Sequence, residues 1–208
     1  MRRDVSAAMF ALVAVISLIA QTPQGWMVRV DRSTSASDPD AAGGIKFVMM
    51  GTGFHATNPQ AAVFWNPANT ATGNYSLKGT FTLLKPSSHT NYYGLVFGGS
   101  ELGGAGQNYV YFMVAQDGTW LIKRRDGAAT RDIAKAANDA VKRPDATGKS
   151  TNALEVLVRA DKIEYVVNGI TVHTTPKTGP TAKTDGIHGI RVNHQLEVQV
   201  DGFAASKL

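Results

Sequence analysis

The chain contains no cysteine among its 208 residues. This absence excludes disulfide bonds, thiolate nucleophiles and cysteine-bound metal ions. A chain of this length without disulfides must be stabilised by an apolar core, which one domain of this size can supply. For an exported chain, the same absence favours the periplasm or the exterior of a bacterium over a eukaryotic secretory route.

Only one long apolar run is present, the uncharged segment Ala7–Ala20 (AAMFALVAVISLIA), which follows Arg2 and Arg3. It is shorter than the ~20 residues that span a bilayer, and its length suits the core of a signal peptide. We therefore expect residues 1–20 to be a signal peptide and residues 21–208 to be a single secreted or periplasmic domain without a membrane span. The alternative is an anchor that is retained.

The chain is poor in clustered charge, because its net charge is only +5 and Lys123-Arg124-Arg125 is the one tight basic group. Three basic residues at a strand end are typical of a solvated edge, so nucleic acid is not expected as a partner. The glycine-rich stretch Gly98–Asn108 precedes a predicted strand rather than a helix and lacks a Gly-Lys-Ser/Thr ending. Nucleotide binding is not expected either.

Strand-forming segments recur every 8–15 residues, separated by Gly, Pro, Asn and Asp. This spacing predicts an all-β fold, a two-sheet antiparallel jelly-roll sandwich. The segment Ser33–Gly44 is expected to be a surface loop. Ala128–Val141 is rich in alanine and predicts a short helix or an irregular crossing, and the structure of 128–148 stays open. The expected strands are Trp26–Val30, Ile45–Met49, Ala62–Trp65, Tyr75–Leu84, Tyr92–Phe97, Val110–Ala115, Trp120–Arg125, Leu154–Arg159, Ile163–Val167, Ile170–Thr174, Gly189–Asn193 and Leu196–Phe203.

The dipeptide Asp117-Gly118 joins two of these segments and predicts a two-residue type I′ turn. That turn would place Gln116 opposite Thr119, Met113 opposite Ile122 and Tyr111 opposite Arg124. Alternation would then give one face to Tyr109, Tyr111, Met113, Trp120, Ile122 and Arg124, and the other, core face to Val110, Phe112, Val114 and Leu121.

The dipeptide Asn168-Gly169 predicts a second type I′ turn, with Val167 opposite Ile170, Tyr165 opposite Val172 and Glu164 opposite His173. The preceding segment Leu154–Arg159 is expected to return through Ala160-Asp161 into the same sheet. The predicted core face of these three strands is Leu154, Val156, Val158, Ile163, Tyr165, Val167, Ile170 and Val172.

The order of several segments resembles the concanavalin A-like lectin/glucanase superfamily, including laminin-G-like modules and the exported bacterial 3-keto-disaccharide hydrolase domain. These segments are NYYGLVFGG (91–99), YVYFMV (109–114), DGTWLIKRR (117–125), VVNGITV (166–172), DGIHGIRVNH (185–194) and VDGF (200–203). The similarity covers about Tyr75 to Phe203. It implies a concanavalin A-like jelly roll whose concave face or rim loops contact carbohydrate, and it carries over no catalytic residue.

Flat aromatic side chains next to planar polar groups are typical of sites for pyranose rings. Tyr109, Tyr111 and Trp120 with Arg124 predict such a glycan-binding face, and Glu101, Gln107 and Asn108 could reach it from the preceding loop. The alternative is that the aromatics lie under a loop or in the core, with Arg124 stacked on Tyr111. We therefore expect a carbohydrate-binding protein that is not an enzyme. An extracellular adhesion or scaffold module is a further alternative.

An enzyme acting on a modified disaccharide or glycan is the other alternative, and it would need two carboxylates. The Glu-x-Asp-x-x-Glu pattern of the superfamily's glucanases is missing. Glu155 and Glu164, diagonal neighbours across a hairpin, are the one close pair that the register predicts. Solvent-facing charges, with Glu164 paired to His173, are the simpler interpretation.

No cofactor is expected, because none of the five histidines shows the i, i+4 spacing of a helical zinc site. Calcium is left open, since jelly rolls often bind it through loop carboxylates. Asp38 and Asp40 are the nearest candidates, and a solvated Asp-Pro-Asp turn is the favoured alternative.

Overall fold

The structure is a computed structural model that describes residues 23–208. The predicted signal peptide, residues 1–20, lies outside the described residues. Residues 23–208 contain no helix with the length and hydrophobicity that a membrane span requires.

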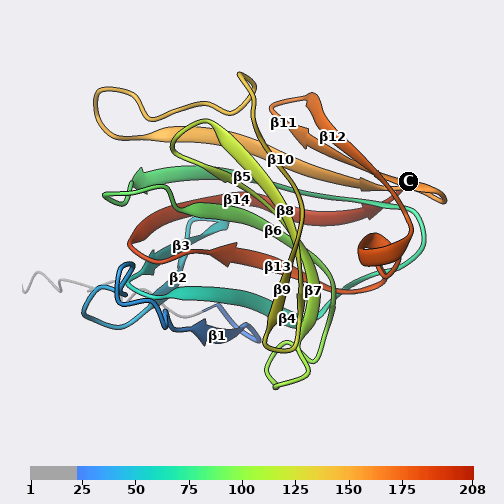
Figure 1. Cartoon of the computed structure of the whole chain (residues 1–208), viewed down its shortest axis with the longest axis horizontal. Helices are drawn as coiled ribbons and strands as arrows, with labels where there is room; N and C mark the ends of the chain where they lie inside the picture. The colour runs from blue at the N-terminus through green and yellow to red at the C-terminus, as the bar shows by residue number, and fades with distance from the viewer. Residues whose placement is uncertain (1–22) are drawn as a thin grey trace, which may run out of the picture.

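Two antiparallel sheets of seven strands each make up the fold (Figure 1). The first, called sheet A, has the order β1 (Met27–Asp31), β4 (Ala61–Ala71), β13 (Gly186–Val192), β6 (Tyr92–Ser100), β7 (Asn108–Ala115), β8 (Thr119–Asp126) and β9 (Ala129–Ala137). The second, sheet B, has the order β12 (Ile170–Pro176), β11 (Lys162–Val167), β10 (Ser150–Val158), β5 (Tyr75–Lys85), β14 (Leu196–Lys207), β3 (Gly53–Asn58) and β2 (Lys46–Met50). A 3₁₀ turn, η1 (Gly179–Thr181), precedes β13. The predicted all-β, two-sheet antiparallel sandwich is confirmed.

The main core lies between the two sheets, because every second residue of each central strand points inward. Sheet B contributes Phe81, Leu83, Leu154, Val156, Val158, Ile163, Tyr165, Val167, Val198 and Val200 to it. Sheet A contributes Phe64, Tyr93, Leu95, Phe97, Val110, Phe112, Val114, Trp120, Ile122, Ile190 and Val192. Six of the eight residues predicted as core on β10 to β12 are fully buried there, whereas Ile170 is exposed and Val172 is partly buried.

The predicted type I′ turn at Asn168-Gly169 is confirmed, since both residues have positive φ (50° and 82°) and Val167 lies opposite Ile170. The register shifts after the pair Val166↔Thr171, because β12 carries one extra residue, Val172, between the partners of Val166 and Tyr165. Tyr165 therefore faces His173 rather than Val172, and Glu164 faces Thr174 rather than His173. A bulge adds a residue to one strand, which no turn sequence predicts.

The predicted register at Asp117-Gly118 is wrong by one residue. The loop has three residues, Gln116 to Gly118, and only Gly118 has positive φ (84°). Its N–H donates to the carbonyl oxygen of Ala115 at 3.2 Å, as in a type I turn followed by a left-handed residue. Met113 consequently pairs with Leu121, and Tyr111 pairs with Lys123.

The segment Ala128–Val141 forms neither a helix nor an irregular crossing over most of its length. Residues 129–137 form β9, which pairs with β8 from Asp126↔Ala129 to Thr119↔Ala137. Backbone pairing with an available strand edge outweighs the helix preference of alanine, which amounts to tenths of a kcal/mol per residue. The segment Ser33–Gly44 is a surface loop, as predicted.

Candidate functional site

The pairing of β7 with β8 is shifted by one residue from the predicted register, and this shift separates the residues predicted to form a glycan-binding face. Tyr109 and Tyr111 point away from sheet B, into a second apolar cluster on the outer face of sheet A. Trp120 points the opposite way, into the core between the sheets, and shares that face with Val114. The prediction that Trp120 and Tyr111 lie on one face is therefore wrong. The sequence alternation was correct within each strand, but the pairing between the strands was not.

The polar residues of the predicted site also lie elsewhere. Arg124 is on the same strand face as Trp120, and its guanidinium donates to the Pro180 carbonyl oxygen at 2.9 Å and to Asn108 Oδ1. Asn108 and the exposed Glu101 line a separate hollow beside Lys183. Gln107 is buried and donates to the carbonyl oxygen of Gly127. The structure does not bring these four residues together with Tyr111.

An arginine that the sequence did not single out occupies the place predicted for Arg124. The Arg191 guanidinium from β13 lies 5.5 Å from the centre of the Tyr111 ring and donates to the Tyr109 hydroxyl at 3.0 Å. Its Nη1 also lies 2.5 Å from Asp31 Oδ2. Burial raises the pKa of both tyrosines, against the lowering effect of the Arg191 charge. The phenols are therefore neutral, and the four side chains form a structural network under the outer face.

A hollow of about 320 Å³ lies above this network, on the outer face of β6 to β9. Its buried floor contains Tyr92, Tyr111, Met113 and Leu121. Polar side chains surround the floor: Asp38, Thr90, Asn91, Lys123, Asp132, Lys135, Arg191 and Asn193. The hollow therefore combines apolar and aromatic surface with donors and acceptors of both charges.

Two of the cationic groups at this hollow are held in place by neighbours. Lys135 Nζ lies 5.6 Å from the centre of the Tyr92 ring, and contact with that phenol raises the pKa of Lys135. Lys123 Nζ lies 2.9 Å from Asp132 Oδ1, and Asp132 is largely exposed. Lys135 therefore stays charged at neutral pH, and the ammonium groups of both lysines can donate to a ligand at the rim.

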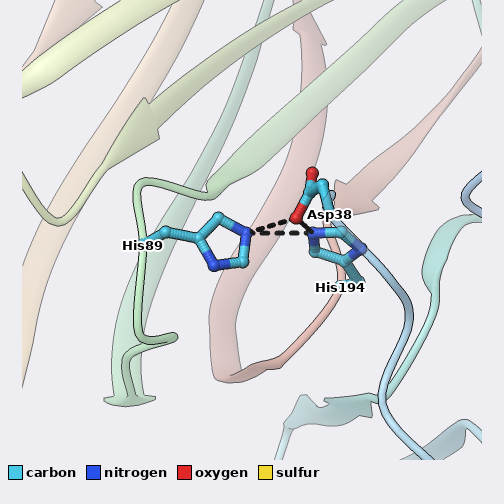
Figure 2. A group of neighbouring side chains, drawn as sticks. All are labelled: Asp38, His89 and His194. Atoms are coloured by element: carbon cyan, nitrogen blue, oxygen red, sulfur yellow. Dashed lines mark hydrogen bonds and ion pairs between the residues drawn. The ribbon is translucent and has the colours of Figure 1, made fainter. Parts of the chain in front are cut away.

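Three loops that cross between the two sheets meet beside this hollow. They are the β1–β2 loop with Asp38, the β5–β6 loop with His89 and the β13–β14 turn with His194. Figure 2 shows the three side chains pointing toward one another. One donor atom of each, Asp38 Oδ1, His89 Nε2 and His194 Nε2, lies within 4.8 Å of the others.

This cluster was missed in the sequence because its members lie far apart along the chain. The nearest signal was the Asp38/Asp40 pair, for which calcium was left open. The structure does bring both aspartates to one place, through His194: Asp40 Oδ1 lies 3.1 Å from His194 Nδ1. Calcium at these two residues stays a prediction.

The alternative catalytic pair lies on the outer face of sheet B, away from the hollow. Glu155 and Glu164 are diagonal neighbours across β10 and β11, as predicted. Glu155 accepts a hydrogen bond from Ser76 Oγ at 2.5 Å. Hydrogen bonds from Arg159 and Lys162 lower the pKa of Glu164. A lowered pKa keeps Glu164 ionised at neutral pH, which is the opposite of what a general acid requires.

No family model and no curated protein matches the sequence. Solved structures do match the fold. The carbohydrate binding module CBM66 from Bacillus subtilis superposes with a TM-score of 0.63 at 10% identity, over 88% of this chain and 96% of the module. A protein of unknown function with a galectin-like fold, also from Bacillus subtilis, superposes with a TM-score of 0.62 at 14% identity, over 88% of this chain and 89% of its own.

The carbohydrate recognition domain of Emp46p is a third similar structure, with a TM-score of 0.56 at 11% identity over 85% of each chain. At these identities the likeness concerns the fold alone. It confirms the predicted fold, in which two antiparallel sheets form a jelly-roll sandwich.

Proposed function

We propose that this protein is an exported, non-catalytic carbohydrate-binding module that holds a glycan in the hollow on the outer face of sheet A. Two of the similar structures are, by their names, a carbohydrate binding module and a carbohydrate recognition domain. Their likeness favours glycans as the ligand class, and the residues of the hollow supply the argument for the place.

The observation that carries the proposal is the composition of the hollow. Tyr92 and Tyr111 are largely buried, but the parts of them that line the hollow are aromatic surface that the C–H face of a pyranose ring can contact. Lys123, Lys135 and Asp132 surround them with charged donors and acceptors, and a hydrogen bond to a charged group is stronger than one between neutral groups. Sugar hydroxyls carry both donors and acceptors, so this mixed rim suits them.

The residues of the proposed site differ from the predicted binding face, which included Tyr109, Trp120 and Arg124. Tyr109 and Trp120 are buried in two different clusters, and neither offers its ring to a ligand. Tyr111 is the one aromatic residue of the predicted face that also lines the hollow. The proposed site keeps Tyr111 and replaces the other members with residues from β6, β8 and β9.

A glycan array probed with the purified protein tests the proposal, followed by calorimetric titration with a glycan that it retains. Lys135→Ala and Asp132→Ala remove exposed rim groups and should each weaken binding about tenfold, the loss expected when one charged hydrogen bond of about 1.5 kcal/mol disappears. The matched control is Lys78→Ala, an exposed lysine on sheet B. Equal affinities of Lys135→Ala and Lys78→Ala would place the glycan elsewhere.

The non-catalytic part of the proposal rests on the state of the carboxylate pair that the sequence predicted, Glu155 and Glu164. Glu164 is bonded to two cations and Glu155 to a serine, so neither is free to act as a general acid. Incubation with glycans that bind should release no reducing sugar. Release that disappears in Glu155→Gln or Glu164→Gln would support the enzyme instead.

Export is the third part of the proposal, and it rests on residues 1–20 of the sequence. Expression of the full chain in a bacterium, followed by fractionation and N-terminal sequencing, should recover a product that begins near Gln21 outside the cytoplasm. A full-length product in the cytoplasmic fraction would contradict export.

A further inference from the structure

We propose that the three inter-sheet loops beside the hollow form a binding site for a divalent transition metal ion of the zinc class. The ligands are Asp38 Oδ1, His89 Nε2 and His194 Nε2, one from each loop (Figure 2). The inference concerns the metal alone and does not depend on glycan binding.

The distances among the three donor atoms fit one ion. His89 Nε2 lies 2.7 Å from Asp38 Oδ1 and 3.2 Å from His194 Nε2, and His194 Nε2 lies 3.1 Å from Asp38 Oδ1. In a tetrahedral zinc site with ligands at about 2.0–2.1 Å, two ligand atoms are roughly 3.3 Å apart. Movements of a few tenths of an ångström therefore suffice to seat an ion, and a fourth position is left for water.

The second ring nitrogen of His194 has a carboxylate beside it: Nδ1 lies 3.1 Å from Asp40 Oδ1. A carboxylate accepts hydrogen bonds, so with an ion bound at Nε2 the ring proton would lie at Nδ1 and be donated to Asp40. This carboxylate–histidine arrangement is the usual support of a metal-bound histidine. Asp40 is itself fixed, because its Oδ2 accepts from the Ser33 backbone N–H at 3.0 Å.

Polar neighbours hold the His89 ring in place. Ser87 Oγ donates to the His89 carbonyl oxygen and accepts from Asn91 Nδ2 at 3.3 Å. Asn91 Nδ2 also lies 3.0 Å from His89 Nε2. An imidazole nitrogen has one lone pair, so an ion bound at Nε2 would replace this contact.

Three atoms that can coordinate a metal therefore converge, 2.7 to 3.2 Å from one another. Their lone pairs repel at this distance, and a cation among them would offset that repulsion. Two imidazole nitrogens and one carboxylate oxygen suit zinc, copper or nickel, whereas calcium prefers oxygen ligands throughout. A proton on one imidazole is the competing occupant, and the experiment separates the two.

A bound ion would join three separate crossings between the sheets. It would also fix one side of the hollow, because Asp38 lines it, Asn91 lies two residues from His89, and Asn193 precedes His194. The consequence that can be measured is a metal-dependent increase in thermal stability, since an ion that binds only the folded chain stabilises it.

The test uses the protein purified without a histidine tag, stripped with EDTA and titrated with ZnCl₂ by calorimetry at pH 7.5. We expect one ion per chain and a rise in the thermal midpoint. Asp38→Asn and His89→Gln should each reduce the affinity more than 100-fold. Asp40→Asn keeps an acceptor but removes the charge behind His194, and should reduce it 10- to 100-fold.

The matched control is His55→Gln, because His55 is also half-buried and also lies 2.9 Å from a carboxylate, that of Glu197. It should bind zinc as the wild type does. Co²⁺ provides a second readout, since a four-coordinate complex gives intense visible absorption that an unfolded variant cannot give. No binding to the wild type, equal binding by His89→Gln and His55→Gln, or binding of Ca²⁺ but not of Zn²⁺ would each overturn the inference.

Discussion

Asp31 and Arg191 form a largely buried ion pair on the outer face of sheet A, with 2.5 Å between Asp31 Oδ2 and Arg191 Nη1. The two residues come from β1 and β13, which flank β4 on either side. The pair therefore spans β4. Arg191 also contacts the side chains of Tyr109 and Tyr111, which lie beneath the hollow.

Removal of one partner of this pair should destabilise the folded protein, because the other charge would remain buried without an opposite charge beside it. Asp31→Asn is expected to lower the free energy of unfolding by about 3 kcal/mol. Urea denaturation followed by tryptophan fluorescence measures it. The control is Asp132→Asn, which breaks the exposed Lys123–Asp132 pair and should cost less than about 1 kcal/mol. Equal losses in the two variants would contradict the assignment of Asp31 as a buried partner.

The same pair gives a dependence of stability on acid pH. Burial raises the pKa of Asp31, but the charge and hydrogen bond of Arg191, together with Arg125 and Arg29, hold that pKa below its usual value. A carboxyl group with a lowered folded pKa contributes its full stability above the unfolded pKa of about 3.9. The contribution disappears as the pH falls from there through the folded pKa.

Unfolding free energies measured from pH 2.5 to pH 7 for the wild type and Asp31→Asn should show this effect. The difference between the two proteins should be constant above about pH 5 and shrink below about pH 4. A difference that stays constant down to pH 2.5 would mean that Asp31 is not the group responsible.

Trp120 separates the proposed site from the face that the sequence predicted. Its ring is buried between the sheets, 5.1 Å from the centre of the His173 ring. Trp120→Ala should therefore lower the free energy of unfolding by about 3–5 kcal/mol, as for other large core truncations. Glycan affinity, measured at a temperature at which the variant stays folded, should remain within about twofold of the wild type.

Lys135→Ala is the natural comparison, because it should show the opposite pattern, with stability kept and affinity lost. Loss of glycan affinity in folded Trp120→Ala, with no loss in Lys135→Ala, would contradict the proposed site and indicate binding at the face of β8 that contains Trp120.

The two turn dipeptides show how much of the turn structure and strand register could be predicted from local sequence. Asn168-Gly169 places two residues with positive φ in sequence, which asparagine and glycine both tolerate, and the predicted turn was correct. Asp117-Gly118 belongs to the same class of dipeptide, but its loop contains Gln116 as well. Two- and three-residue loops both accept Asp-Gly, so the dipeptide alone could not decide the register.

The candidate site depended on contacts that no local pattern encodes. Arg191 of β13 reaches Tyr111 of β7 across the intervening strand β6, where it is paired with Gly94, and this arrangement follows from the order of the strands. The ligands of the proposed metal site come from three loops separated by dozens of residues. Neither the spacing of histidines nor their strand parity could have placed His89 beside His194.

The sequence by itself determined twelve of the fourteen strands of residues 23–208 (all but β3 and β9), most of their inward-facing residues and the architecture. These follow from period-two alternation and from turn residues that act over a few positions. Tertiary structure alone decided which strand edge paired with the alanine-rich segment, which way Trp120 points relative to Tyr111, and which loops meet at Asp38. The physical reason is that pairing between distant strands depends on packing summed over both sheets, and a shift of one residue inverts every side chain that follows.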